Sequence, residues 1–319
     1  MRVLMLFLDG VGIGKSDPSV NPFFAAKLPA IRSLFDGEVP SLRKRTLSSR
    51  HATLVPLDAT LGVAGLPQSG TGQTALFTGV NASKLVGKHF GPHPYSTLKP
   101  IVKEKNIFKR LLDVEKKPCF ANAFPQRFFD YMNNGRSRLT VTTLSCMMSG
   151  IPILRAEDLV EGRGISADIT SEGWRTLGYP DMPTIEPAEA GRRLARLSAQ
   201  HDFVLFEYWK PDRAGHSRNM NEAIDVLQRF DAMLIGILEA LDSSDTLLLI
   251  TSDHGNVEDL SSKSHTRNPV PAILYGHRHD EIAHRLNSAS KRSANIAHVT
   301  PNLMEALAAE EQPARVGSA

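Results

Sequence analysis

Short apolar runs alternate along the chain with longer stretches in which apolar residues recur at three- and four-residue steps. The runs at 2–8, 203–208 and 245–252 are almost uninterrupted, which is typical of strands buried on both faces of a parallel sheet. Three shorter runs have the length and flanking residues of strands. We therefore predict strands at 2–8, 52–58, 118–123, 203–208, 245–252 and 271–275.

The stretches with helical spacing lie between these runs, and the clearest is 219–241. We expect the helix at 300–309 to begin with Thr300 as N-cap and Pro301 as its first residue. The segment 62–79, rich in Gly, Ser and Thr, is predicted as a loop that leads into a short helix at about 73–78. The other predicted helices are 22–35 with a break at Pro29, 106–113, 139–149 and 187–199.

Strands that alternate with helices predict an α/β protein. We expect three layers, with a mainly parallel central sheet and helices on both of its faces. In such sheets ligands bind at the carboxyl ends of the strands. The residues that follow each predicted strand are therefore the first candidates for a functional site.

Composition narrows the class of protein. Hydrophobic residues make up 41% of the 319 positions and charged residues 22%, as in an ordinary globular chain. The net charge is +3 and the densest basic stretch is only Arg43-Lys44-Arg45, so no nucleic-acid binding is predicted. Cys119 and Cys146 are too few for a disulfide framework. Because we find neither a signal peptide nor a membrane span, we expect a cytoplasmic protein.

A Gly-Lys-Ser sequence after the first strand suggests a nucleotide-binding P-loop. A P-loop needs a glycine five positions before Gly14, and that position is Asp9. A carboxylate there would repel a triphosphate, which excludes the P-loop. Asp9 itself stands at the end of a buried strand, where it caps a turn or takes part in a site.

Acidic residues and histidines follow three of the predicted strands. Charged groups are seldom placed at the end of a buried strand without a partner. Carboxylate oxygen and imidazole nitrogen are ligands of zinc and manganese, and two ions could share six such groups. The candidate ligands are Asp9, Asp212, His216, Asp253, His254 and His265.

A two-metal site commonly works with a nucleophile. The segment 66–79 offers the hydroxyl groups of Ser69, Thr71 and Thr74, and local sequence does not choose among them. His89 and His93 follow soon after it, either as contacts for a substrate phosphate or as plain loop histidines.

The motifs together resemble the alkaline phosphatase superfamily, and most of all its cofactor-independent phosphoglycerate mutase and phosphopentomutase branch. In the mutases the nucleophilic serine precedes two glycines by three and ten residues. Counted back from Gly72 and Gly79, both spacings arrive at Ser69. The segments that carry the resemblance are Phe7-Leu8-Asp9-Gly10, Gln68-Ser69-Gly70-Thr71-Gly72-Gln73, Pro211-Asp212-Arg213-Ala214-Gly215-His216, Asp253-His254-Gly255-Asn256 and His265-Thr266-Arg267-Asn268-Pro269-Val270-Pro271.

The resemblance implies a division of roles. Two divalent ions, Mn²⁺ or Zn²⁺, would be bound, and Ser69 would carry the phosphoryl group of a small-molecule phosphate ester as a covalent intermediate. One ion would be held by Asp9, Ser69, Asp253 and His254, and the other by Asp212, His216 and His265.

The chain departs from this branch after the nucleophile segment, where the mutases carry a large inserted domain. Residues 80–202 must here supply core elements as well, so we expect a single domain over 1–319 in which about 80–186 contains at most a small cap. A mutase must exclude water while the phosphoryl group is on the enzyme. We therefore expect hydrolysis, by a phosphatase or phosphodiesterase. The alternatives are a phosphomutase and an inactive metal-binding protein.

Overall fold

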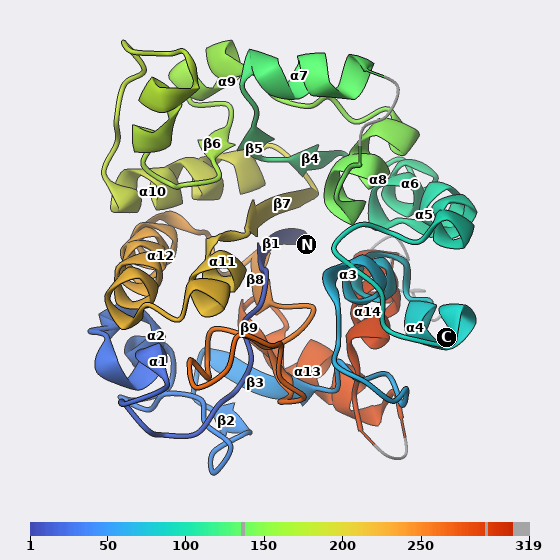
Figure 1. The fold of residues 1–319 in the computed structure, drawn as a ribbon, viewed down its shortest axis with the longest axis vertical. Helices are drawn as coiled ribbons and strands as arrows, with labels where there is room; N and C mark the ends of the chain where they lie inside the picture. Colours follow the sequence, from blue (N-terminus) through green and yellow to red (C-terminus); the bar gives the residue numbers. More distant parts are fainter. Residues whose placement is uncertain (135–137, 291–292, 309–319) are drawn as a thin grey trace, which may run out of the picture.

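The computed structural model describes residues 1–134, 138–290 and 293–308. Within them, seven strands form a central sheet in the order β2-β3-β9-β8-β1-β7-β4 (Figure 1). The strands are β1 (Arg2–Leu8), β2 (Leu47–Ser48), β3 (Ala52–Leu57), β4 (Pro118–Phe120), β7 (Phe203–Tyr208), β8 (Thr246–Thr251) and β9 (Val270–Gly276).

The direction of the strands divides this sheet in two. Strands β4, β7, β1 and β8 pair in parallel. Strand β9 pairs antiparallel with both β8 and β3, and β2 pairs antiparallel with β3. The carboxyl ends of β1, β7 and β8 therefore meet at one edge of the parallel half.

Side chains of β1 alternate between two apolar clusters, one on each face of the sheet. Leu4, Leu6 and Leu8 belong to one cluster, whereas Val3 and Met5 belong to the other. Helices of the first face are α1 (Pro22–Ala25), α2 (Pro29–Leu34), α10 (Pro187–Ser198) and α12 (Met220–Ala240). Those of the second face are α3 (Ser69–Thr78), α5 (Lys99–Lys105), α6 (Ile107–Leu112), α8 (Val141–Ser149), α13 (His279–Ser288) and α14 (Val299–Ala308). The predicted three-layer α/β class is confirmed.

Helix α3 begins at Ser69, several residues before the predicted start at about 73. The glycines that suggested a loop instead allow close packing. A Cβ atom at Gly70 would lie 2.2 Å from the carbonyl oxygen of His93, and one at Gly72 would lie 2.9 Å from that of Asp253. Tertiary packing thus overrides the low helix propensity of this segment.

Two further details differ from the sequence-based predictions. Helix α14 begins at Val299, so Thr300 is not its N-cap; the buried Thr300 hydroxyl donates to the carbonyl oxygen of Leu76 at 2.6 Å. The run at 118–123 is divided between two sheets. Its first part is β4, and its last two residues form β5 (Asn122–Ala123), which pairs in parallel with β6 (Ile165–Ser166).

The strands β5 and β6 belong to a small lobe at one end of the molecule, which we define as residues 122–134 and 154–182 (top of Figure 1). It also contains α7 (Gln126–Asn133), α9 (Ala156–Val160) and the 3-10 helix η2 (Glu172–Leu177). A separate apolar cluster that includes Leu159, Trp174 and Met182 supports it. The predicted single domain over 1–319 stays a prediction. No helix in the described ranges has the length and apolar character that a membrane span requires.

Candidate metal centre

Asp9 directly follows β1 at the edge where the parallel strands end. Its backbone N–H donates to the carbonyl oxygen of Tyr208 at 3.1 Å, which extends the pairing with β7 by one residue. The next residue, Gly10, has φ +72°, and a Cβ atom there would lie 2.7 Å from Asp212. A glycine at this position lets the Asp9 turn approach Asp212 closely.

Asp253 and His254 follow β8, the neighbour of β1, and both are fully buried. Ser252 joins the two strand ends: its hydroxyl accepts from the N–H of Val11 at 3.0 Å and donates to the carbonyl oxygen of His254 at 3.0 Å. The Asp253-His254 turn is therefore fixed against the turn that carries Asp9.

Helix α11 (Lys210–Ser217) follows β7 and carries Asp212 and His216 one turn apart. Their side chains meet, with 3.3 Å between Nε2 of His216 and Oδ2 of Asp212. His265 comes from a loop and lies with its Nε2 3.2 Å from that of His216 and 3.5 Å from Oδ1 of Asp212. All three offer ligand atoms within 4.8 Å of one another.

Ser69 is the first residue of α3, and its Oγ lies 2.9 Å from Nε2 of His254. The same nitrogen lies 3.3 Å from Oδ1 of Asp9 and 3.6 Å from Oδ2 of Asp253. The rings of His254 and His265 stack with centroids 3.9 Å apart. The structure thus brings all seven predicted site residues together.

The other candidate hydroxyls are used inside α3. Thr71 Oγ1 donates to the carbonyl oxygen of Gln68 at 3.2 Å, and Thr74 Oγ1 donates to that of Gly70 at 2.6 Å. The ring nitrogens of His89 lie 3.1 Å from the hydroxyl of Ser83 and 3.2 Å from the carbonyl oxygen of Val63, so His89 takes no part in the cluster.

Burial and like charges shape the electrostatics of the cluster. Burial raises the pKa of Asp9 well above its usual value, and the carboxylates of Asp253 and Asp212 raise it further. Burial and Asp212 raise the pKa of Asp253 in the same direction. Burial, with His265 as the next cause, lowers the pKa of His254 well below its usual value. A bound cation would reverse the carboxylate shifts, and a neutral imidazole is the form that binds metal.

Several polar atoms of the cluster are buried without a hydrogen-bond partner in the described part of the chain. They include both carboxylate oxygens of Asp253 and Nδ1 of His254. Unpartnered buried polar atoms are costly and rare in folded proteins. Oxygen and nitrogen donors of this kind suit zinc or manganese, so the residues present fit divalent ions.

Two residues that the sequence analysis gave no role hold the ligands in place. Asn256 donates from Nδ2 to Oδ1 of Asp212 at 2.7 Å and to its carbonyl oxygen at 3.0 Å. Oε2 of Glu258, a residue only 1% exposed, accepts from the N–H of Gly12 at 2.9 Å and of Asn256 at 2.7 Å. The sequence signal was their place in the segment Asp253–Glu258, which closely follows a buried strand and is polar except at Gly255 and Val257.

Comparison with known proteins gives one family model. Residues 179–311 match the metalloenzyme superfamily. The chain is 30% identical over 146 residues to the 2,3-bisphosphoglycerate-independent phosphoglycerate mutase of Thiobacillus denitrificans. The aligned part makes up 43% of this chain and 26% of that protein. To the mutase of Antithamnion sp. the chain is also 30% identical, over 113 residues. The aligned part makes up 34% of this chain and 21% of that protein. The chain thus spans about a quarter of the length of one curated relative and about a fifth of the other.

Solved structures share the fold over nearly the whole chain. The PH0037 protein from Pyrococcus horikoshii aligns with a TM-score of 0.56 at 15% identity, covering 98% of each chain. The alkaline phosphatase of the Antarctic bacterium TAB5 aligns with a TM-score of 0.50 at 14% identity, covering 98% of this chain and 99% of that one. Together with the family model and the mutase relatives, these likenesses confirm the resemblance to the alkaline phosphatase superfamily that the motifs predicted.

Proposed function

We propose, from this resemblance, that the protein is a two-metal phosphoryl-transfer enzyme that hydrolyses a small phosphate ester through a phosphoserine intermediate on Ser69. The observation that carries the proposal is the position of Ser69 Oγ, 2.9 Å from His254 Nε2, where the two groups of acidic and histidine ligands meet. A serine among unpartnered ligand atoms is what such a reaction requires.

The seven residues divide into two ligand sets. Asp9, Ser69, Asp253 and His254 would hold one ion, and Asp212, His216 and His265 would hold the other. Asp212 also lies within 4.8 Å of ligand atoms of Asp9 and His254, so its carboxylate borders both sets. Bound Mn²⁺ or Zn²⁺ would supply the Lewis acidity that lowers the pKa of a hydroxyl group and offsets charge on the phosphoryl oxygens.

The chain's own groups orient the reactants. The Ser69 hydroxyl stands at the N-terminus of α3, where the helix dipole favours a phosphate group. In the first step the bond between Ser69 Oγ and phosphorus forms, the ester P–O bond breaks, and the alcohol leaves with a proton. In the second step water attacks phosphorus, the Oγ–P bond breaks, and inorganic phosphate leaves while the serine regains its proton.

Solvent access favours hydrolysis over transfer back to the substrate. The His216 side chain is 47% exposed, so water reaches the mouth of the site. A phosphomutase would need to exclude that water.

We extend the proposal to a single-domain, cytoplasmic protein. The cytoplasmic location is supported by the thiols of Cys119 and Cys146, which are both free.

The test is phosphate release from a panel of phosphate monoesters and diesters with Mn²⁺ or Zn²⁺, beside a sugar-phosphate isomerisation assay. We expect the wild type to release phosphate and Ser69→Ala to release none while still binding metal. Ser19→Ala, which removes an exposed hydroxyl that donates to Asp17, is the matched control. Isomerisation without free phosphate would show a phosphomutase. No turnover of any ester would favour an inactive metal-binding protein.

A further inference from the structure

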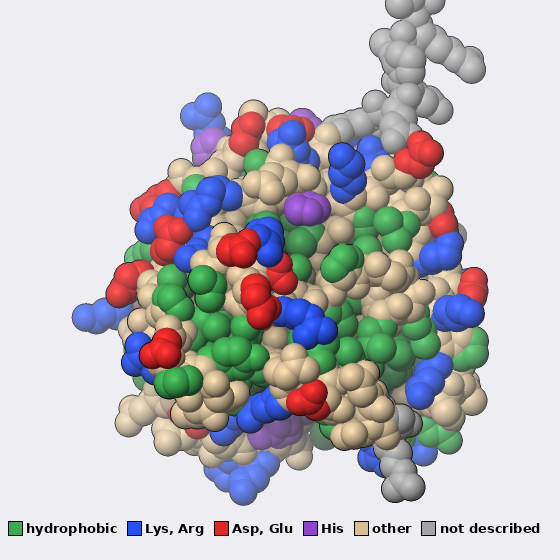
Figure 2. Space-filling view, turned by 90° about the horizontal axis from the view of Figure 1, so that it is seen from above, with side chains coloured by type: hydrophobic (Ala, Val, Ile, Leu, Met, Phe, Trp, Pro, Cys, Tyr) green, Lys and Arg blue, Asp and Glu red, His purple; other side chains and the backbone are tan. Residues whose placement is uncertain are grey.

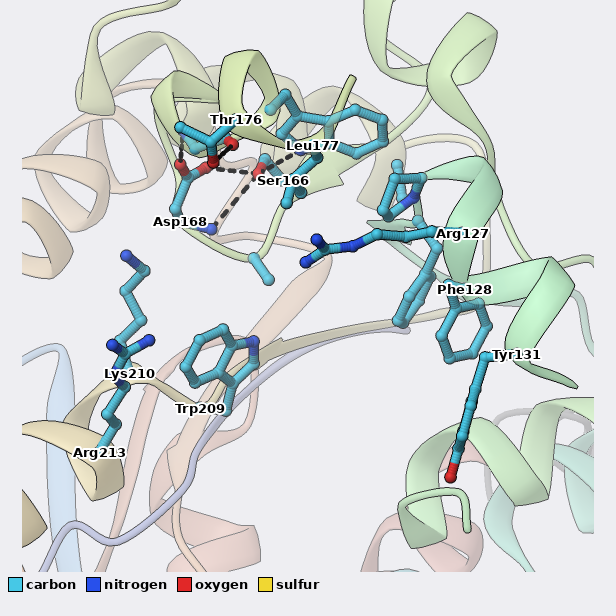
Figure 3. A pocket seen from close by; sticks show the side chains of 16 residues that line it. Arg127, Phe128, Tyr131, Ser166, Asp168, Thr176, Leu177, Trp209, Lys210 and Arg213 are labelled. Carbon is cyan, nitrogen blue, oxygen red and sulfur yellow. Dashed lines mark hydrogen bonds between the residues drawn. The ribbon is translucent and has the colours of Figure 1, made fainter. Parts of the chain in front are cut away.

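A cavity of about 710 Å³ lies between the small lobe and α11 (Figure 3). Helix α7 contributes Arg127, Phe128 and Tyr131 to one wall, and residues 166–168, 173–174 and 176–177 form another. Trp209 and the start of α11 form the side nearest the metal centre. The volume falls within the range of about 300–1,000 Å³ that is common for pockets that bind drug-sized ligands.

The cavity adjoins the candidate metal centre through α11. Asp212 lines the pocket that also contains Ser69 and His265, whereas its neighbour Arg213 lines the large cavity. Consecutive residues of one helix therefore line the two pockets.

The charge of the lining is positive. The lining contains three cationic side chains, those of Arg127, Lys210 and Arg213, and one carboxylate, that of Asp168, so its net charge is +2. The Asp168 carboxylate already accepts from the N–H groups of Ser171 at 2.9 Å and Gly173 at 2.6 Å. In the part of the chain that the structure describes, none of the three cations forms an ion pair. Figure 3 shows Arg127 reaching from α7 toward the cavity, opposite Trp209.

Aromatic rings make up much of the remaining lining. Trp209 is 37% exposed and Tyr131 is 43% exposed, although both are large side chains that proteins usually cover. Phe124 and Phe128 pack with ring centroids 4.2 Å apart at the wall of the cavity. Figure 2, which looks onto the small-lobe end, shows hydrophobic side chains exposed across its middle among basic and acidic ones.

We propose that this cavity is the leaving-group subsite of the enzyme and selects phosphate esters whose alcohol part carries a flat ring and a second anionic group. The inference rests on the proposed function, because it places the phosphoryl group at Ser69. Rings stack on the exposed aromatic side chains, and the guanidinium and ammonium groups, which form no ion pair in the described ranges, bind the second anion; the Lys210 ammonium lies 5.9 Å from the centroid of the Trp209 ring.

Binding can be measured without turnover. The chain has two tryptophans, Trp174 and Trp209, and both line the cavity. Metal-loaded Ser69→Ala is titrated with inorganic phosphate, ethyl phosphate, phenyl phosphate and 4-carboxyphenyl phosphate, and tryptophan fluorescence is followed. We expect 4-carboxyphenyl phosphate to bind at least tenfold more tightly than phenyl phosphate, and phenyl phosphate more tightly than ethyl phosphate.

Charge variants locate the second anion. Arg127→Gln and Arg213→Gln are each expected to weaken 4-carboxyphenyl phosphate binding about tenfold and phenyl phosphate binding less than twofold. Arg175→Gln is the matched control, because Arg175 lies in η2 and is exposed but does not line the cavity. Thermal unfolding of each variant checks that the fold is retained.

The outcomes separate the subsite from the proposed function. Equal affinity for all organic esters, unchanged in both arginine variants, would overturn the subsite even if the wild type hydrolyses them. The expected order of affinity in Ser69→Ala, with no ester cleaved by the wild type, would support the subsite and overturn the proposed hydrolysis.

Discussion

Ser69 Oγ and His254 Nε2 lie 2.9 Å apart, although 185 residues separate them in the sequence. The same nitrogen faces Asp9 at 3.3 Å. One lone pair cannot both bind a metal ion and accept the serine proton, so these two roles of His254 exclude each other. The low pKa that burial gives the imidazole suits a neutral ligand.

His254→Ala is therefore expected to lose one equivalent of bound metal, or to bind it at least about 100-fold more weakly, since removing even a residue that only supports a ligand costs about 10–100-fold. Metal content after dialysis and calorimetric titration measure this. Ser69→Ala is the comparison and should retain at least one ion with little change. Full metal binding in His254→Ala, with only turnover lost, would instead assign His254 as a proton acceptor.

Asn256 holds Asp212 through two hydrogen bonds, and its replacement tests that support. Asn256→Ala should lower metal affinity or turnover about 10–100-fold while Asp212 itself remains. Asn302→Ala removes another buried amide, which bonds to the carbonyl oxygen of His298 away from the site. We expect Asn302→Ala to change stability but not metal affinity. Equal effects of both variants on metal affinity would show a general loss of packing rather than a positioning role.

A pH test is available at Glu207, a buried residue of β7 whose Oε2 accepts from the Thr142 hydroxyl at 2.6 Å. Burial raises the pKa of Glu207 from its ordinary value of 4.5 to about 7. Between these values the unfolded chain releases the proton while the folded protein keeps it. The free energy of unfolding therefore falls as the pH rises from 4.5 to 7. The slope is about 1.4 kcal/mol per pH unit, which gives a total of about 3 kcal/mol.

Glu207→Gln lacks this titration, so its stability relative to the wild type should increase over that window and stay constant above it. Urea unfolding at pH 4.5, 5.5, 6.5, 7.5 and 8.5, under identical metal conditions, measures the difference. Thr142→Val removes the hydrogen bond that lowers the pKa of Glu207, and should move the upper end of the window to higher pH. A difference that does not change with pH would contradict the raised pKa.

The parallel half of the sheet and most of its site could be predicted because most of the ligands stand next to a strong local pattern, whereas Ser69 was chosen through the resemblance and His265 stands in a loop. Asp9 directly follows β1, Asp253 comes two residues after β8, and Asp212 and His216 follow a third strand at helical spacing. Parallel strands that end at one edge bring such residues together, whatever the loops do. The same reasoning could not find the start of α3, because glycines needed for contact with His93 resemble loop glycines.

The large cavity escaped prediction for a different reason. Its lining comes from three separate segments, at 123–131, 166–177 and 209–213, and the second lies where the sequence has no clear period. Arg127 and Trp209 have no local spacing that relates them. Only the packing of the small lobe against the core places them on one cavity, and that depends on long-range contacts.

The glycines after β1, which first suggested a nucleotide loop, give a last prediction through Glu258. A Cβ atom at Gly12 would lie 2.3 Å from Oε1 of Glu258, whereas one at Gly14 would lie 2.6 Å from the backbone oxygen of the same residue. Gly12→Ala and Gly14→Ala should each cost about 1–3 kcal/mol of stability through overpacking.

The two glycines should respond differently to the loss of the Glu258 side chain. In a Glu258→Ala background, the cost of Gly12→Ala, the first cost, should largely disappear because the clashing carboxylate is gone. The second should persist because the backbone oxygen remains, and a double-mutant cycle from urea unfolding measures both. Additive costs for Gly12→Ala and Glu258→Ala would show that Gly12 is required for its turn and not for the Glu258 carboxylate.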